Sequence, residues 1–127
     1  MPSKNREFGD LGEKVATYHL MKRGYKIIER NYKKPWGEID IVCRKDNLLV
    51  FCEVKTRDLA NVKHYLAEYS INALKIKKLQ KICETYLTNK KYPYNQKWQI
   101  DVIAVTIDKS TGKAKINHIK NAVWERP

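Results

Sequence analysis

Two neighbouring stretches decide the fold of this chain: GEIDIV at residues 37–42 and LLVFCEVK at residues 48–55. Both stretches have the composition of β-strands, and the turn-forming pair Asp46-Asn47 lies between them, which predicts a β-hairpin. The second stretch is apolar on both of its faces up to Cys52. This pattern is typical of a central strand that is covered on both sides.

Acidic residues interrupt both apolar stretches at matching positions. If Asp46-Asn47 is a two-residue loop, Lys45 pairs with Leu48, and the same register places Asp40 directly opposite Glu53. Opposed Cβ atoms lie about 4.5–5.5 Å apart on one face of a sheet. Two carboxylates at that distance repel each other, so the sequence predicts either a shifted pKa or a cation between them.

The residue types around this pair favour a divalent cation. Asp40, Glu53 and the Val54 carbonyl supply hard oxygen ligands, which suit Mg²⁺ or Mn²⁺. The Lys55 ammonium follows on the same face as Glu53, where it could orient an attacking water or stabilise charge on a phosphate. The alternative is structural, with Lys55 forming salt bridges to Glu38 and Glu53 at the sheet margin.

The rest of the pattern predicts an α/β domain spanning 1–127, with one mixed central sheet flanked by helices in the order α-β-β-β-α-β-β. Hydrophobic periodicity predicts helices over 10–23, ended by Gly24, and over 71–87. The expected strands cover 25–32, 38–45, 48–56, 99–107 and 115–119, and Pro35-Trp36-Gly37 marks the first turn.

The first helix offers one further acid. Its predicted apolar face consists of Leu11, Val15, Ala16, Tyr18 and His19. Glu13 lies on the flank of that face, three residues after Asp10. It is therefore either part of a variant capping box that begins at Asp10 or an additional ligand that reaches the carboxylate pair.

Two charges fall within apolar patterns elsewhere. Lys75 shares a helical stripe with Leu79 and Ile82, so it either extends towards solvent or points towards the carboxylates or a phosphate. Asp101 lies in the strand predicted over 99–107. A structural role for Asp101, paired with Lys75 or Arg57, is favoured.

The overall charge predicts an anionic partner. The chain has 127 residues, 26 Lys+Arg, 14 Asp+Glu and a formal net charge of +12. Lysines interleave with Tyr92, Tyr94 and Trp98, a combination that suits phosphate contacts and base stacking in nucleic acids. The candidate nucleic-acid-binding residues are Arg57, Lys75, Lys77, Lys78, Lys81, Lys90 and Lys91.

Other classes of protein are disfavoured. The sequence shows no secretory signal and no apolar run of membrane-spanning length, so a cytoplasmic protein without a membrane partner is expected. The cysteines, Cys43, Cys52 and Cys83, lack C-x-x-C spacing, and the three histidines are scattered, which disfavours a zinc site.

Asp40 followed by Glu53-Val54-Lys55 resembles the D…(D/E)-x-K core of the restriction-endonuclease-like nuclease superfamily. The whole chain more closely resembles the YraN-type family of small bacterial predicted nucleases, which are similar to archaeal Holliday-junction resolvases. The motifs that carry this resemblance are Gly12-Glu13 with Ala16, Gly24-Tyr25, Asn31, Gly37-Glu38-Ile39-Asp40, residues 51–57, Lys75 and residues 101–105.

The resemblance implies a nuclease core in which Asp40 and Glu53 bind Mg²⁺, Lys55 assists and Glu13 is a further acid at the site. Relatives of the resolvase type also suggest a homodimer, although no isolated apolar stripe in the sequence demands one. The chain departs from the family pattern after Arg57, since no glycine occurs between Arg57 and Lys75.

Three functions follow from these observations. The first is a metal-dependent endonuclease that hydrolyses phosphodiester bonds in DNA, with branched or structured DNA among its candidate substrates. The second is a catalytically inactive nucleic-acid-binding module on a nuclease-like fold. The third is a basic component of a ribonucleoprotein.

Overall fold

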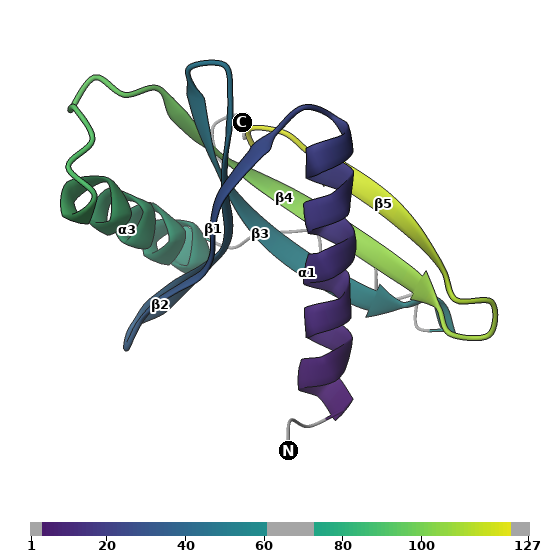
Figure 1. Ribbon diagram of the computed structural model, residues 1–127. Coiled ribbons are helices and arrows are strands. Elements are labelled where there is room, and N and C mark those ends of the chain that lie inside the picture. The colour runs from purple at the N-terminus through teal and green to yellow at the C-terminus, as the bar shows by residue number, and fades with distance from the viewer. Residues whose placement is uncertain (1–3, 61–72, 123–127) are drawn as a thin grey trace.

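The computed structural model describes residues 4–60 and 73–122, which form one α/β unit built on a five-stranded mixed sheet (Figure 1). The elements follow the predicted order: α1 (Lys4–Lys22), β1 (Lys26–Lys34), β2 (Gly37–Lys45), β3 (Leu48–Asp58), α3 (Ala73–Asn89), β4 (Trp98–Asp108) and β5 (Lys113–Ile119).

The strands lie in chain order across the sheet, β1-β2-β3-β4-β5. Neighbouring strands are antiparallel except β3 and β4, which are parallel and are joined through α3. The predicted hairpin register is confirmed, because Lys45 pairs with Leu48 and Ile41 with Cys52. Asp46 adopts a φ of 55°, the left-handed conformation that a tight two-residue turn requires.

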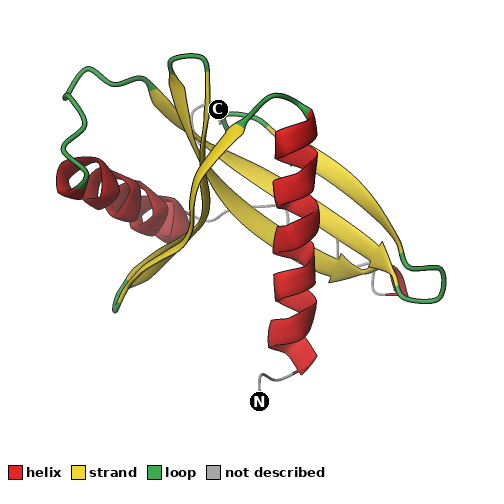
Figure 2. Ribbon diagram, viewed as in Figure 1, coloured by secondary structure: helices red, strands yellow, loops and turns green. Residues whose placement is uncertain are grey.

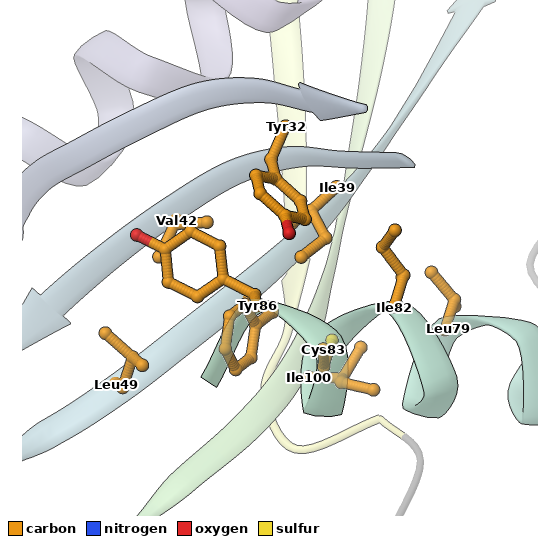
Figure 3. Close-up of a cluster of buried hydrophobic side chains, with 10 residues drawn as sticks. Tyr32, Ile39, Val42, Leu49, Leu79, Ile82, Cys83, Tyr86 and Ile100 are labelled. Atoms are coloured by element: carbon orange, nitrogen blue, oxygen red, sulfur yellow. The ribbon is translucent and has the colours of Figure 1, made fainter. Parts of the chain in front are cut away.

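Each face of the sheet buries its own apolar cluster, and the helices lie on opposite faces (Figure 2). Alternation along β3 explains this arrangement: Leu49 and Phe51 pack towards α3, whereas Val50 and Cys52 pack towards α1. Figure 3 shows the α3 side of the core, whose labelled members are Tyr32, Ile39, Val42, Leu49, Leu79, Ile82, Cys83, Tyr86 and Ile100.

The first helix begins six residues earlier than predicted, at Lys4, and Asp10 is therefore inside it rather than at its cap. Its predicted apolar face is correct in part: Ala16 and His19 are buried as expected, whereas Leu11 and Tyr18 are 46% and 63% exposed. The predicted helix end is confirmed: α1 ends at Lys22, and Gly24 follows with a φ of +88°, which favours glycine.

The helix α3 presents the predicted apolar residues to the core, with Leu79, Ile82, Cys83 and Tyr86 all buried. Leu74, expected on the same face, is instead 64% exposed, and the predicted start at residue 71 lies outside the described residues. Neither helix in the described part of the chain combines the length and apolar character needed to cross a membrane.

The three cysteines behave as buried apolar residues, as predicted. All are free thiols, and the Sγ atoms of Cys43 and Cys52 lie 3.9 Å apart between β2 and β3. Burial raises the pKa of Cys83, and contact with Cys43 together with burial raises that of Cys52. Thiols held in their neutral form are poor nucleophiles, so these residues act in packing.

Asp101 has a structural role, as expected, but its predicted pairing with Lys75 or Arg57 is wrong. Its fully buried carboxylate contacts the His118 Nε2 at 2.7 Å and accepts hydrogen bonds from the Gln99 side chain and the Asn121 backbone amide. His118 continues the network through a 3.2 Å contact between its Nδ1 and the His19 Nε2. His19 and His118 are far apart in the sequence, and only the tertiary structure brings α1 and β5 close enough for the two rings to meet.

This network predicts a loss of stability in acid. Burial, with help from the positive charge of Arg23 and from His118, lowers the pKa of His19 from 6.5 to about 4. Between pH 6.5 and about 4, His19 is protonated in the unfolded chain but stays neutral in the folded protein. The free energy of unfolding therefore falls as the pH drops. We expect the free energy of unfolding to fall, relative to a His19→Gln variant, by roughly 2 kcal/mol between pH 7.5 and 4.5.

Chemical denaturation of both proteins across this pH range measures the difference directly. Glutamine keeps a polar side chain beside His118 but does not titrate, so the ionisable groups that respond equally in both proteins cancel in the comparison. Parallel stability curves for the two proteins would show that His19 is not the responsible group.

Candidate active site

The strands β2 and β3 separate before they reach Asp40 and Glu53, and we call the place where they separate the fork. The backbone ladder between β2 and β3 ends at Ile41 and Cys52, and Figure 1 shows the β1–β2 hairpin bending away from β3 and β4 beyond that point. Asp40 lies at the fork, and its Oδ2 accepts a 2.7 Å hydrogen bond from the Val54 backbone amide. The Asp40 side chain thus bridges the strands where the ladder has stopped.

Asp40 is an acid in an unfavourable position. Asp40 is only 8% exposed. Burial, and to a smaller extent the negative charge of Glu53, raises the pKa of Asp40 from 3.8 to about 7. Glu13 and Glu38 add smaller effects in the same direction, while the Val54 hydrogen bond opposes them. Glu53 therefore raises the pKa of Asp40, but the predicted direct pairing of the two residues is not formed, because the backbone ladder ends at Ile41 and Cys52.

Two lysines accompany Glu53. The Lys75 Nζ lies 3.0 Å from the Glu53 Oε1, so of the two interpretations of Lys75 the one in which it points towards the carboxylates is correct. Burial and the nearby Lys75 lower the pKa of Lys55 to about 8, against the opposing effect of Glu53. The structural alternative, in which Lys55 forms a salt bridge with Glu38, does not hold for that pair, because Glu38 lies 3.9 Å from Lys33 on β1 instead.

Glu13 reaches the fork from α1, and its alternative role in a capping box is excluded because it is well inside the helix. Its Oε1 lies 3.5 Å from the Arg30 Nη2 on β1. Burial raises the pKa of Glu13, against the effect of Arg30. The preceding Gly12 is buried against Thr56 of β3. Because α1 approaches β3 closely at Gly12, Glu13 lies beside β3.

The charged side chains around the fork line two separate hollows. Glu13, Lys55 and Arg57 line one of about 330 Å³ beside α1. Glu53 and Lys75 line another of about 210 Å³ beside α3. Within residues 4–60 and 73–122 no group of three acidic, histidine or cysteine side chains is arranged to hold a metal ion. Glu13 and Glu53 each contact a cationic side chain instead.

The predicted nucleic-acid-binding residues divide into those near the fork and those distant from it. Arg57, Lys75 and Lys78 line the two hollows. Lys77 and Lys81 are exposed on α3, whereas Lys90 and Lys91 follow the far end of that helix. Lys90 lies 3.5 Å from Glu29, so part of the basic stretch is engaged in an ordinary surface ion pair.

Sequence reasoning missed two residues at this site. Arg30, which contacts Glu13, belongs to β1, and no local pattern connects the two. Trp36 was treated as part of a turn, yet it lines the hollow that contains Glu53. A large aromatic residue beside Gly37 in an exposed turn was the available signal, because such a turn has no need for apolar bulk.

Together these features define a class: a small basic α/β domain with an aspartate, a glutamate and two lysines at a fork in its sheet. The family model described as "Uncharacterised protein family UPF0102" matches residues 12–105, which include the whole of this cluster. The chain belongs to the UPF0102 family, and the resemblance to the YraN-type family is confirmed at that level.

Relatives are similar along nearly their entire length. A UPF0102 protein of Syntrophomonas wolfei is 42% identical over 120 residues, covering 93% of this chain and 98% of its own. One from Thermodesulfovibrio yellowstonii is also 42% identical, covering 93% and 96%. A UPF0102 protein of Dictyoglomus thermophilum is 41% identical over 106 residues, covering 84% and 87%.

Proposed function

We propose that this protein is a metal-dependent endonuclease that hydrolyses phosphodiester bonds in DNA on a restriction-endonuclease-like fold. The observation that carries the proposal is the buried Asp40, held at the fork beside Glu53 and two lysines. A buried carboxyl beside a second acid is a poor structural choice, and it is retained at the point where basic side chains could hold a phosphate.

The residue types at the fork suit a hard divalent cation, although the described residues are not arranged around one while Glu13 and Glu53 remain in their ion pairs. Asp40 and Glu53 would hold Mg²⁺ or Mn²⁺, with the Val54 carbonyl and Glu13 as further oxygen ligands. The raised pKa of Asp40 supports this fit, because a cation would replace the proton that the carboxyl otherwise retains. When bound, the metal supplies Lewis-acid neutralisation of charge on the phosphate.

The side chains of the protein would supply positioning and charge. The Lys55 and Lys75 amines lie where they could stabilise the negative charge that develops on the phosphate as water attacks. An oxygen–phosphorus bond forms from that water, and the bond from phosphorus to the leaving sugar oxygen breaks. The proton released by the water passes to solvent, and the leaving oxygen takes up a proton from the same source.

One observation favours a second candidate function, a nucleic-acid-binding module without activity. Glu13 and Glu53 contact Arg30 and Lys75, and these ion pairs would have to open before either acid could bind a metal. A protein that kept them closed would retain its basic surface but would not cleave.

Asp40→Asn and Glu53→Gln distinguish these functions. We expect each variant to lose Mg²⁺- or Mn²⁺-dependent cleavage by at least roughly 100-fold, because each loses a ligand for the charge-neutralising cation. Binding should be retained, since neither residue is basic. The assay uses linear, flapped and four-way DNA, with gel-shift titration in EDTA for binding.

Glu84→Gln is the matched control, because it removes an exposed acid from α3 at a distance from the fork and should cleave like the wild type. If the wild-type protein binds these DNAs but cleaves none of them, the inactive binding module is correct. If Asp40→Asn cleaves at the wild-type rate, the proposed site is wrong.

A further inference from the structure

A hollow beside the fork contains features that the proposed chemistry does not use. This hollow, of about 210 Å³, lies between the β1–β2 turn and α3. Glu53 and Lys75 line it together with Trp36, Leu79 and Ile82. It therefore combines an aromatic ring and an apolar surface with the charged groups of the candidate active site.

Trp36 is placed for contact with a ligand. It is 41% exposed in the turn between β1 and β2, where the indole is not needed to complete the core. The Lys81 Nζ lies 4.7 Å from the centre of its ring, and this cation–π contact orients the indole against α3. The exposed part of the indole leaves apolar ring surface available to a partner.

The surroundings of Trp36 match a nucleobase. Leu79 and Ile82 are 7% and 1% exposed and form the apolar part of the lining. Lys75 and Lys78 line the same hollow together with the acids Glu38 and Glu53, and the Lys75 Nζ lies 3.0 Å from Glu53. Lys78 and Lys81 are exposed on α3 beside the indole, where their charges could contact a phosphate backbone. An aromatic ring combined with lysines is how proteins hold unpaired bases, because the π-face stacks and the cations contact phosphates.

We propose that Trp36 and this hollow take up one unpaired nucleobase next to the phosphate that is cleaved. The proposal rests on the proposed function, and it specifies the substrate: DNA with an unpaired nucleotide at a fork or flap. A base inside a continuous duplex is stacked on both sides and would first have to be extruded, which costs a few kcal/mol. Forked DNA avoids that cost.

The test measures stacking and binding without cleavage. Forked DNA with 2-aminopurine at the first unpaired position is titrated with protein in EDTA, and its fluorescence reports stacking of that base. We expect wild-type protein to quench the fluorescence. Trp36→Ala should abolish the quenching and weaken binding roughly 5- to 100-fold, the range for loss of one stacked base. Trp36→Phe should keep a large part of both.

Tyr18→Ala is the matched control, since Tyr18 is an exposed aromatic residue on α1 with the Lys22 Nζ over its ring, and it is not part of the hollow. It should quench and bind like the wild type. A blunt duplex of the same sequence should bind Trp36→Ala and wild-type protein equally.

The outcomes separate this proposal from the proposed function. If Trp36→Ala quenches and binds forked DNA like the wild type, or if Tyr18→Ala weakens binding equally, the base site is wrong even where Asp40-dependent cleavage is found. If Trp36-dependent quenching occurs without any Mg²⁺-dependent cleavage, the base site stands and the nuclease function fails.

Discussion

Replacement of Asp40 by asparagine is expected to stabilise the metal-free protein at pH 8 by up to about 4 kcal/mol. The buried carboxyl carries a charge there that both burial and Glu53 oppose. Asparagine has nearly the same shape and keeps an oxygen to accept the hydrogen bond from the Val54 amide. Its amide group brings no charge, so the penalty disappears.

The stabilisation should depend on pH in a defined direction. The pKa of Asp40 is about 7 in the folded protein and 3.8 is its ordinary value, so the folded state binds the proton more tightly. Wild-type stability therefore falls as the pH rises from about 4 to 7, and no further loss from this group follows above 7. The advantage of Asp40→Asn should be negligible near pH 4 and complete at pH 8.

Denaturant unfolding in EDTA at pH 4, 6 and 8 checks this expectation. Glu84→Gln removes an exposed acid and should change stability by less than about 0.5 kcal/mol at each pH. Millimolar Mg²⁺ at pH 8 should stabilise the wild type but not Asp40→Asn, because a ligand that binds the folded state raises its stability. A variant less stable than the wild type at pH 8 would contradict the unfavourable placement of the Asp40 charge.

The second large effect is expected at Gly12. A Cβ atom at this position would overlap the Thr56 Oγ1 and would lie 2.8 Å from both the Cβ and the Cγ2 of Thr56. Rotation of the Thr56 side chain cannot relieve a contact with its own Cβ, so α1 must move away from β3. We expect Gly12→Ala to lose about 2–3 kcal/mol of stability, the usual cost of overpacking.

Gly9→Ala is a control within the same helix. Nothing lies within 4 Å of a Cβ placed at Gly9, so alanine should stabilise the protein by roughly 0.5–1 kcal/mol through its higher helix propensity. Thermal or denaturant unfolding should therefore move in opposite directions for the two variants. Adding Thr56→Gly to Gly12→Ala should recover part of the loss, and strict additivity would show that these residues do not clash.

The hairpin was predictable because its determinants are local. A two-residue turn and the alternation of side chains define the pairing of Lys45 with Leu48, and that register brings the charges of Asp40 and Glu53 together. The sequence also predicted the order of the elements. It could not predict that the ladder would stop at Ile41, where β2 separates from β3 but remains paired with β1.

The helix faces show a second limit of local pattern. Leu11 and Tyr18 have the spacing of a buried stripe but are exposed, whereas Gly12 and Ala16 lie against the sheet. Periodicity identifies a helix, yet the face that packs is chosen by how closely two backbones approach. Here the approach of α1 to β3 requires small residues, a requirement that hydrophobicity does not encode.

The sequence by itself determined the order of the helices and strands along the chain and the register of the hairpin that carries Asp40 and Glu53, because these features depend on residues close together in the chain. The tertiary structure alone decided the partners of the acids: Arg30 for Glu13, Lys75 for Glu53, and His118 for Asp101. It also decided that Trp36 borders the same hollow as Glu53. Ion pairs and ring contacts form between residues that are distant in the sequence. The packing of α1, α3 and β5 on the sheet brings these residues into contact.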